Sequence, residues 1–377
     1  MPAETDVQTG TIMAWPTAHS VGDEKYPATG SEIRKTRQEV AEIAKAIAKH
    51  QPVEIFVRDP KLGEPARGFP DTNLSSAKEM LGRVKNMTLH VTQNVHSLWA
   101  RDTGPVFVQS LHGPVRNTWG RSDDPGMGFS RKNTASETVG LLLNYNNWGR
   151  KLPPNVDAYF AGYTTQTLNK SSRIAPFVAE GGGIEVDGEG TLLATESSLL
   201  NPNRNPGIDK TTMERYFAEF LGIEKTIWIP GCRGADITDD HIDSIARFSA
   251  PGTVLLSKPF DNGKNGVLDA YHDAKEILSK ATDAKGRRLK LIDVPEPDPR
   301  KVLGEDYDPQ WSTVSYINYT LVNGAVVLAK FGDERFDEQA KRIVGEQFPG
   351  RVVEQVDLRE LASQGGGIHC ATQQIPA

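Results

Sequence analysis

The chain has 377 residues, with 43 Lys or Arg against 49 Asp or Glu, and a formal net charge of -6 at pH 7. Two cysteines are too few for a disulfide framework, and no basic run could follow a phosphate backbone, so we expect a reducing compartment and no nucleic-acid partner. The first ten residues are polar, and no apolar run approaches the roughly 18 residues of a membrane span, which predicts a cytoplasmic protein with no membrane partner.

The first quarter of the chain alternates between predicted strands and helices. Residues 11–15 are expected to form a strand, and apolar residues recur at helical spacing over residues 31–50. The β-branched and aromatic residues over 53–57 predict a second strand. A further helix and strand are expected at residues 74–84 and 87–91, but this pair has no clear place in the repeating pattern described next.

From residue 180 onward the chain repeats one structural pattern three times. Predicted β-hairpins begin at Glu180, His241 and Tyr316, and they turn at the sequences DGEG, APG and NG. Each hairpin is followed by a helix and then by another strand. These pairs are expected at residues 211–221 and 226–229, 269–281 and 289–292, and 336–348 and 352–354.

Two weaker copies extend the repeat to five units. One begins at Trp99 and turns near residues 112–114, and the other begins at Gly367, where the chain ends before a helix can follow. The predicted strand at 11–15, together with the helix and strand that follow it, supplies the missing parts. We therefore expect a closed ring of five units, which leaves no exposed sheet edge between the first and the last unit.

A polar residue stands near the start of each predicted hairpin, although polar side chains are uncommon at the buried positions of a strand. If the units surround an axis, these residues converge on it. The set comprises Asp102, Glu180, His241, Asp243, Asn318 and Cys370.

Each of these residues also has a plainer interpretation. His241 and Asp243 are one residue apart, so on a strand their side chains would point to the same face. The surrounding acidic segment also fits a metal-binding patch or a solvated turn. Cys370 follows three glycines, which fits an accessible nucleophile as well as a small buried residue beside a tight turn. Trp99 fits a core position as well as a substrate slot.

Carboxylates beside a thiol favour a particular class of ligand. They would raise the thiol pKa above its reference of about 8.5 unless the ligand itself were cationic. A planar guanidinium pairs with carboxylates and lowers the thiol pKa as it binds. Attack by Cys370, with His241 as the acid that protonates departing ammonia and then as the base for water, gives a ureido product.

Five segments resemble the agmatine deiminase and bacterial-type (Porphyromonas-type) peptidylarginine deiminase family, within the guanidino-modifying superfamily. They are WARDTGPVFV (99–108), FVAEGGGIEVDGEGTLLATESSLLNPNRNP (177–206), TDDHIDSIARF (238–248), SYINYTLVNGAVV (315–327) and GGGIHCATQQIP (365–376). The resemblance implies a single catalytic domain over residues 1–377, an α/β five-bladed propeller (pentein) with pseudo-fivefold ββαβ repeats and a site on the central axis. It also implies that neither a metal nor an organic cofactor is needed.

The resemblance further assigns roles to individual residues. Cys370 is implied as the nucleophile, His241 as the general acid and base, and Asp102 and Asp243 as the guanidinium clamps. Glu180 is implied to orient His241. Substrate contacts are implied or expected from Trp99, Asn318, Gly367 and Arg150.

The expected partner is a small cationic guanidino substrate, most simply agmatine, which would be converted to N-carbamoylputrescine. The family's Trp-Gly-Gly is Trp148-Gly149-Arg150 here, and an arginine near the substrate tail suits a carboxylate better than an amine. Arginine in peptides, or a small arginine derivative giving citrulline, is therefore the alternative. An amidinotransferase, a metal-dependent hydrolase and a non-catalytic binding module are further alternatives, and a homo-oligomer stays open.

Overall fold

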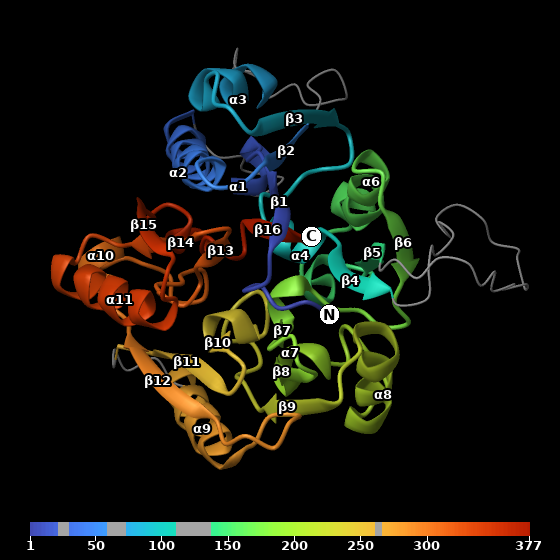
Figure 1. Ribbon diagram of the computed structural model, residues 1–377. Helices are drawn as coiled ribbons and strands as arrows, with labels where there is room; N and C mark the ends of the chain where they lie inside the picture. The colour runs from blue at the N-terminus through green and yellow to red at the C-terminus, as the bar shows by residue number, and fades with distance from the viewer. Residues whose placement is uncertain (22–29, 59–72, 111–136, 261–265) are drawn as a thin grey trace, which may run out of the picture.

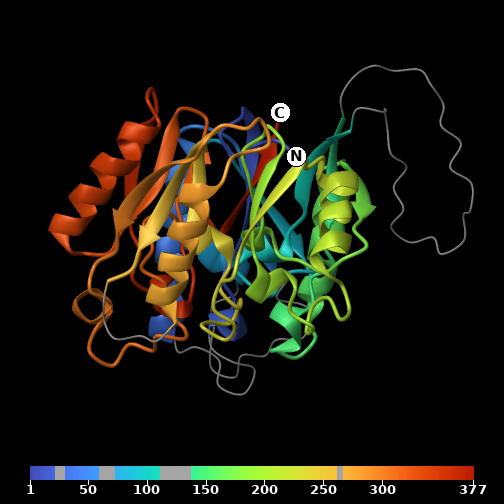
Figure 2. The same cartoon turned by 90° about the horizontal axis from the view of Figure 1, so that it is seen from below.

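The structure is a computed structural model that describes residues 1–21, 30–58, 73–110, 137–260 and 266–377. In these residues the strands form five small mixed sheets. Figure 1 shows the sheets around a common centre, with the longer helices toward the outside. Figure 2 shows that both chain ends lie at the same end of the molecule, where Ala377 N–H donates to Val7 C=O at 2.9 Å.

The two ends of the chain share one sheet. Strand β1 (Gln8–Ala14) pairs antiparallel with β16 (Thr372–Pro376) and parallel with β2 (Val53–Arg58). The prediction that the N-terminal segment completes the last unit is therefore confirmed. Strand β3 (Met87–Thr92), preceded by α3 (Asn73–Leu81), adds a fourth, parallel strand beyond β2. This is the place of the helix and strand that the repeat left unassigned.

The other four sheets have three strands each and share one pairing pattern. The first two strands form an antiparallel hairpin, and the third pairs parallel with the second, as the repeat predicts. The turn expected near residues 112–114 lies outside the described residues. The strands are β4 (Val106–Ser110), β5 (Glu137–Leu142) and β6 (Ser171–Ile174); β7 (Glu185–Val186), β8 (Thr191–Thr195) and β9 (Lys225–Ile229); β10 (Ala246–Ala250), β11 (Thr253–Lys258) and β12 (Lys290–Pro295); β13 (Thr320–Val322), β14 (Ala325–Lys330) and β15 (Val352–Asp357).

In each unit a helix of eight residues or more connects the second strand to the next parallel strand. No helix in the described ranges combines the length and the apolar character that crossing a bilayer requires. The longer helices are α2 (Gly30–Ala48), α6 (Phe160–Thr167), α8 (Lys210–Leu221), α9 (Val267–Lys280) and α11 (Glu334–Gln347), and the shorter ones include α1 (Ala18–Val21), α7 (Glu196–Leu199) and α10 (Pro299–Leu303).

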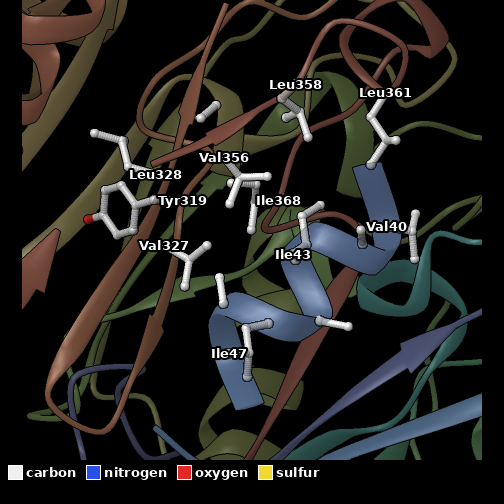
Figure 3. Close-up of a cluster of buried hydrophobic side chains, with 14 of the residues drawn as sticks. Val40, Ile43, Ile47, Tyr319, Val327, Leu328, Val356, Leu358, Leu361 and Ile368 are labelled. Atoms are coloured by element: carbon white, nitrogen blue, oxygen red, sulfur yellow. The ribbon is translucent and has the colours of Figure 1, made fainter. Parts of the chain in front are cut away.

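Helix α2 packs its own unit, which contains β16, β1 and β2, against the neighbouring unit of β13, β14 and β15. Its apolar residues Val40, Ile43 and Ile47 repeat at helical spacing, and Figure 3 shows them facing Val356 and Ile368. All five side chains are buried, which contributes roughly 1.5–3 kcal/mol for each large aliphatic group. Since Ile368 lies two residues before Cys370, this core also fixes the segment that carries the thiol.

Candidate active site

The polar residues of the predicted site lie in short turns that precede the first strands of the units. Asp102 lies in α4 (Ala100–Thr103), and Glu180 precedes a 3₁₀ turn, Gly181–Gly183. His241 caps a second 3₁₀ turn, Ile242–Ser244, and strand β10 begins only at Ala246. The expectation that His241 and Asp243 share one face of a strand is therefore wrong, because the chain turns at these residues before extending.

The turns nevertheless bring three of these side chains together around Gly182. A Cβ atom at Gly182 would lie 2.7 Å from Nδ1 of His241 and 3.0 Å from an oxygen of both Asp102 and Asp243. A side chain at residue 182 would therefore collide with the site. This close approach explains why a glycine stands here, and it places an imidazole and two carboxylates around one point.

Cys370 lies beside this group and is 9% exposed. Its Sγ is 3.6 Å from Oδ2 of Asp243 and 3.3 Å from Nδ2 of Asn318. Sγ is also 3.4 Å from Oδ1 of Asn318, but that oxygen already accepts the backbone N–H groups of His369 and Cys370. The amide nitrogen is therefore the Asn318 group that donates to sulfur. Burial, followed by the charges of Asp243 and Asp102, raises the pKa of Cys370 well above its usual range.

His241 has a carboxylate at each ring nitrogen. Its Nε2 is 3.1 Å from Oε2 of Glu180, and its Nδ1 is 3.7 Å from Oδ1 of Asp102. Burial alone would lower the pKa of His241, but Asp102, Glu180 and Asp243 outweigh it and raise that pKa to about 9. At neutral pH the imidazole is therefore protonated and able to act as an acid.

Arg204 holds Glu180 in place, and the sequence prediction missed it. Its Nε lies 2.9 Å from each carboxylate oxygen of Glu180, and its Nη1 donates to Asp239 at 2.8 Å. Burial would raise the pKa of Glu180, but Arg204 and His241 together lower it. Arg204 lies in the segment 177–206 that carries the family resemblance, but it was assigned no role there, and an isolated charge gives no periodic signal.

Asp102 is held by a tryptophan on a strained turn. Its Oδ2 accepts from Nε1 of Trp148 at 2.8 Å, and its Oδ1 accepts from Gly182 N–H at 3.1 Å. Burial raises the pKa of Asp102, and the charge of His241 opposes that rise. Within α5 (Asn147–Arg150) four successive residues have φ between 50° and 79°, a conformation that costs roughly 1–2 kcal/mol for each non-glycine residue. The side chain of Arg150, at the end of this turn, is exposed.

The two glycines before Ile368 allow close contacts with Trp99 and Asn318. A Cβ at Gly366 would lie 2.4 Å from the ring of Trp99, and one at Gly367 would lie 2.4 Å from Oδ1 of Asn318. Backbone N–H of Arg101 also donates to the carbonyl of Cys370 at 3.1 Å, which ties α4 to the same segment. Trp99 and Asn318 thus both lie directly against the chain that delivers the thiol.

The chain matches the family described as Porphyromonas-type peptidyl-arginine deiminase over residues 1–376. It is 34% identical to an agmatine deiminase of Pseudomonas fluorescens (strain SBW25), an alignment that covers 100% of this chain and 95% of the relative. It is also 34% identical to an agmatine deiminase of Medicago truncatula over 74% of this chain and 76% of the relative.

Among solved structures, the agmatine deiminase of Enterococcus faecalis superposes with a TM-score of 0.79 at 27% identity, covering 100% of this chain and 95% of that one. The fold is thus the α/β fold of the penteins, and the enzyme class is that of hydrolases acting on amidine C–N bonds. On the extent of these matches, the chain belongs to the Porphyromonas-type peptidyl-arginine deiminase family.

Proposed function

We propose that the protein hydrolyses the guanidino group of agmatine, giving N-carbamoylputrescine and ammonia, with Cys370 as the nucleophile. The observation that carries the proposal is the meeting of a thiol, a protonated imidazole and two carboxylates at one buried point. The names of the relatives support agmatine as the substrate. We further interpret the five sheets as blades of a propeller, with this point on its axis.

The carboxylates form the binding site for the cation. Oδ1 of Asp243 is buried and has no hydrogen-bond partner among the described residues, so it is an acceptor available to a guanidinium N–H. Asp102 supplies a second carboxylate, whose Oδ1 accepts from Gly182 N–H at 3.1 Å. Binding a cation between two carboxylates offsets the charges that raise the pKa of Cys370, so the thiol loses its proton to solvent when substrate arrives.

The reaction then proceeds in two halves. The Cys370 thiolate attacks the guanidinium carbon, and His241 protonates one nitrogen of the tetrahedral adduct, which leaves as ammonia and breaks a C–N bond. Neutral His241 next takes a proton from water as that water attacks the thiouronium carbon. Collapse of this second adduct breaks the C–S bond, returns sulfur as the Cys370 thiolate and passes the remaining hydroxyl proton to solvent. The released ureido product is neutral, so the carboxylates bind it weakly.

Asn318 and Glu180 support these steps from either side. Asn318 donates to Sγ at 3.3 Å, which stabilises negative charge on sulfur. Both oxygens of Glu180 accept from Arg204 and one also faces His241, which favours an orienting role over that of a metal ligand.

Arginine-containing substrates are a second candidate, and Arg150 favours them. Arg150 is exposed and follows Trp148 by two residues, and Trp148 bonds directly to Asp102, so we propose that this arginine meets an α-carboxylate on the substrate tail. The aminobutyl tail of agmatine would gain nothing from that charge.

A ureido-product assay of the purified protein tests both candidates, with agmatine, free arginine and peptides with internal or C-terminal arginine as substrates. We expect turnover of agmatine and none by Cys370→Ala. A preference for arginine that disappears in Arg150→Ala would instead favour the second candidate. Adding an amine acceptor separates hydrolysis from amidino transfer, and loss of activity in chelator with resistance to iodoacetamide would contradict the cysteine mechanism.

A further inference from the structure

Glu4, in the N-terminal segment, is buried beside the segment that carries the nucleophile. Its Oε1 accepts from Leu321 N–H at 2.7 Å and from Thr320 Oγ1 at 3.1 Å. Its Oε2 lies 3.0 Å from Nε2 of His369 and contacts the guanidinium of Arg247. Glu4 is 8% exposed, and the contacts at both of its carboxylate oxygens hold the carboxylate in place.

His369 connects Glu4 to the proposed guanidinium site. Its Nδ1 is 2.7 Å from Oδ2 of Asp243, while its Nε2 faces Glu4, and the ring is 1% exposed. A neutral imidazole would leave one ring nitrogen as an acceptor opposite a carboxylate oxygen. With both carboxylates ionised, both ring nitrogens can donate only in the imidazolium form.

The two oxygens of Asp243 have different surroundings as a result. Oδ2 accepts from His369, whereas Oδ1 is buried with no partner among the described residues. We infer that Glu4 and His369 form a positioning pair, in which the Glu4 carboxylate keeps His369 protonated and His369 orients Asp243 so that Oδ1 meets the guanidinium. This inference rests on the proposed function, because it assigns the free oxygen to the substrate cation.

The pair also explains how a carboxylate stays ionised so close to a thiol. Burial would raise the pKa of Asp243, but the hydrogen bond and charge of His369, with His241 and Arg247 beyond it, hold that pKa below its ordinary value. An ionised Asp243 binds a guanidinium through a charge-assisted contact, whereas a protonated one would lose most of that attraction.

Other charged groups lie near His369, and their influence on it must be distinguished from that of Glu4. Arg101 donates through Nε to the carbonyl of His369 at 3.3 Å, and Glu185 lies across Arg247, with its Oε2 3.4 Å from Nε of Arg247. Glu185 is therefore a matched control, since it is a buried carboxylate that contacts Arg247 but makes no hydrogen bond to His369 in the described structure.

The protonation state of His369 can be tested without any activity. The chain has eight histidines, so ¹⁵N-histidine NMR of the intact protein resolves a small set of rings, and His369→Gln identifies the signal that belongs to His369. We expect both ring nitrogens of His369 to be protonated at pH 7.5 in the wild type. We expect Glu4→Gln to leave one ring nitrogen of His369 without a proton at pH 7.5, and Glu185→Gln to leave both protonated. A neutral ring in the wild type, or equal behaviour of the two variants, would overturn the inference.

The effect on substrate is measured as the dissociation constants of agmatine and L-arginine by calorimetry in a Cys370→Ser background. We expect Glu4→Gln to weaken binding about tenfold and Glu185→Gln less than twofold. Added to Asp243→Asn, Glu4→Gln should have almost no further effect. If the background protein binds neither cation, the proposed function and this inference both fail. If it binds one and the two Gln variants weaken binding equally, only the positioning role fails.

Discussion

Replacing Asp243 with asparagine is expected to make Cys370 more reactive toward a small alkylating agent while making the protein a poorer enzyme. The substitution removes a charge whose nearer oxygen lies 3.6 Å from Sγ. At an effective dielectric constant of about 20, a unit charge at that distance contributes about 4–5 kcal/mol to the cost of forming the thiolate. His369, 2.7 Å from the same oxygen, offsets part of this charge, so we expect the substitution to lower the pKa of Cys370 by part of that free energy while burial still raises it.

The thiolate fraction at pH 7, and with it the rate of labelling, should therefore be higher in Asp243→Asn than in the wild type. Turnover should change in the opposite sense, because a buried cation without its charged partner loses about 3–5 kcal/mol, which corresponds to about a thousandfold in kcat/KM.

The assay follows iodoacetamide labelling of Cys370 against pH by mass spectrometry in a Cys232→Ser background, alongside ureido product formation. Glu185→Gln is the control, because Glu185 is a buried carboxylate that makes no contact with sulfur in the described structure, and it should change neither rate. If Asp243→Asn labels no faster than the wild type, or keeps a normal kcat/KM, Asp243 does not act on both the thiol and the cation.

Three further outcomes follow from the same geometry. Since the pKa of His241 is raised to about 9 and the proposed acid must be protonated, kcat/KM should fall above about pH 9. The stability that protonated His241 contributes should be complete below about pH 6.5 and lost as pH rises through 9. A kcat/KM that stays constant up to pH 10 would contradict this. Arg204→Met should lower the free energy of unfolding in urea by about 3–5 kcal/mol, because it leaves Glu180 buried and unpaired, and a loss below 1 kcal/mol would show that the pair is dispensable. Gly366→Ala should reduce kcat/KM with little effect on stability, because its Cβ would displace the Trp99 ring; normal kinetics would remove Trp99 from the site.

The sequence could predict most of the architecture because hairpins and helices leave periodic signals. Apolar alternation and turn residues identified the hairpins after Glu180, His241 and Tyr316, and the chain-end pairing of β1 with β16 followed from counting units. The polar residues were also found from their unusual places. Their local conformation was not, because the 3₁₀ turns at Gly181–Gly183 and Ile242–Ser244 are too short to show a period.

The buried charge network lay beyond the reach of sequence patterns. Arg204, His369 and Glu4 contact partners that are distant in the chain, with 365 positions separating Glu4 from His369. Nothing local distinguishes such residues from solvated surface charges, and only the closed ring brings them together. Strand β3 could not be placed from the sequence for a related reason. It is an extra parallel strand of one unit, and the other units contain no counterpart that would indicate its position.

The most direct test of the mechanism is to stop the reaction during turnover and measure the mass of the protein. With agmatine, we predict a covalent adduct on Cys370 equal to the substrate less ammonia, which forms and decays at rates compatible with kcat and is absent from Cys370→Ser. Ureido product formed at the wild-type rate by Cys370→Ser, or an adduct found on Cys232 alone, would contradict the account.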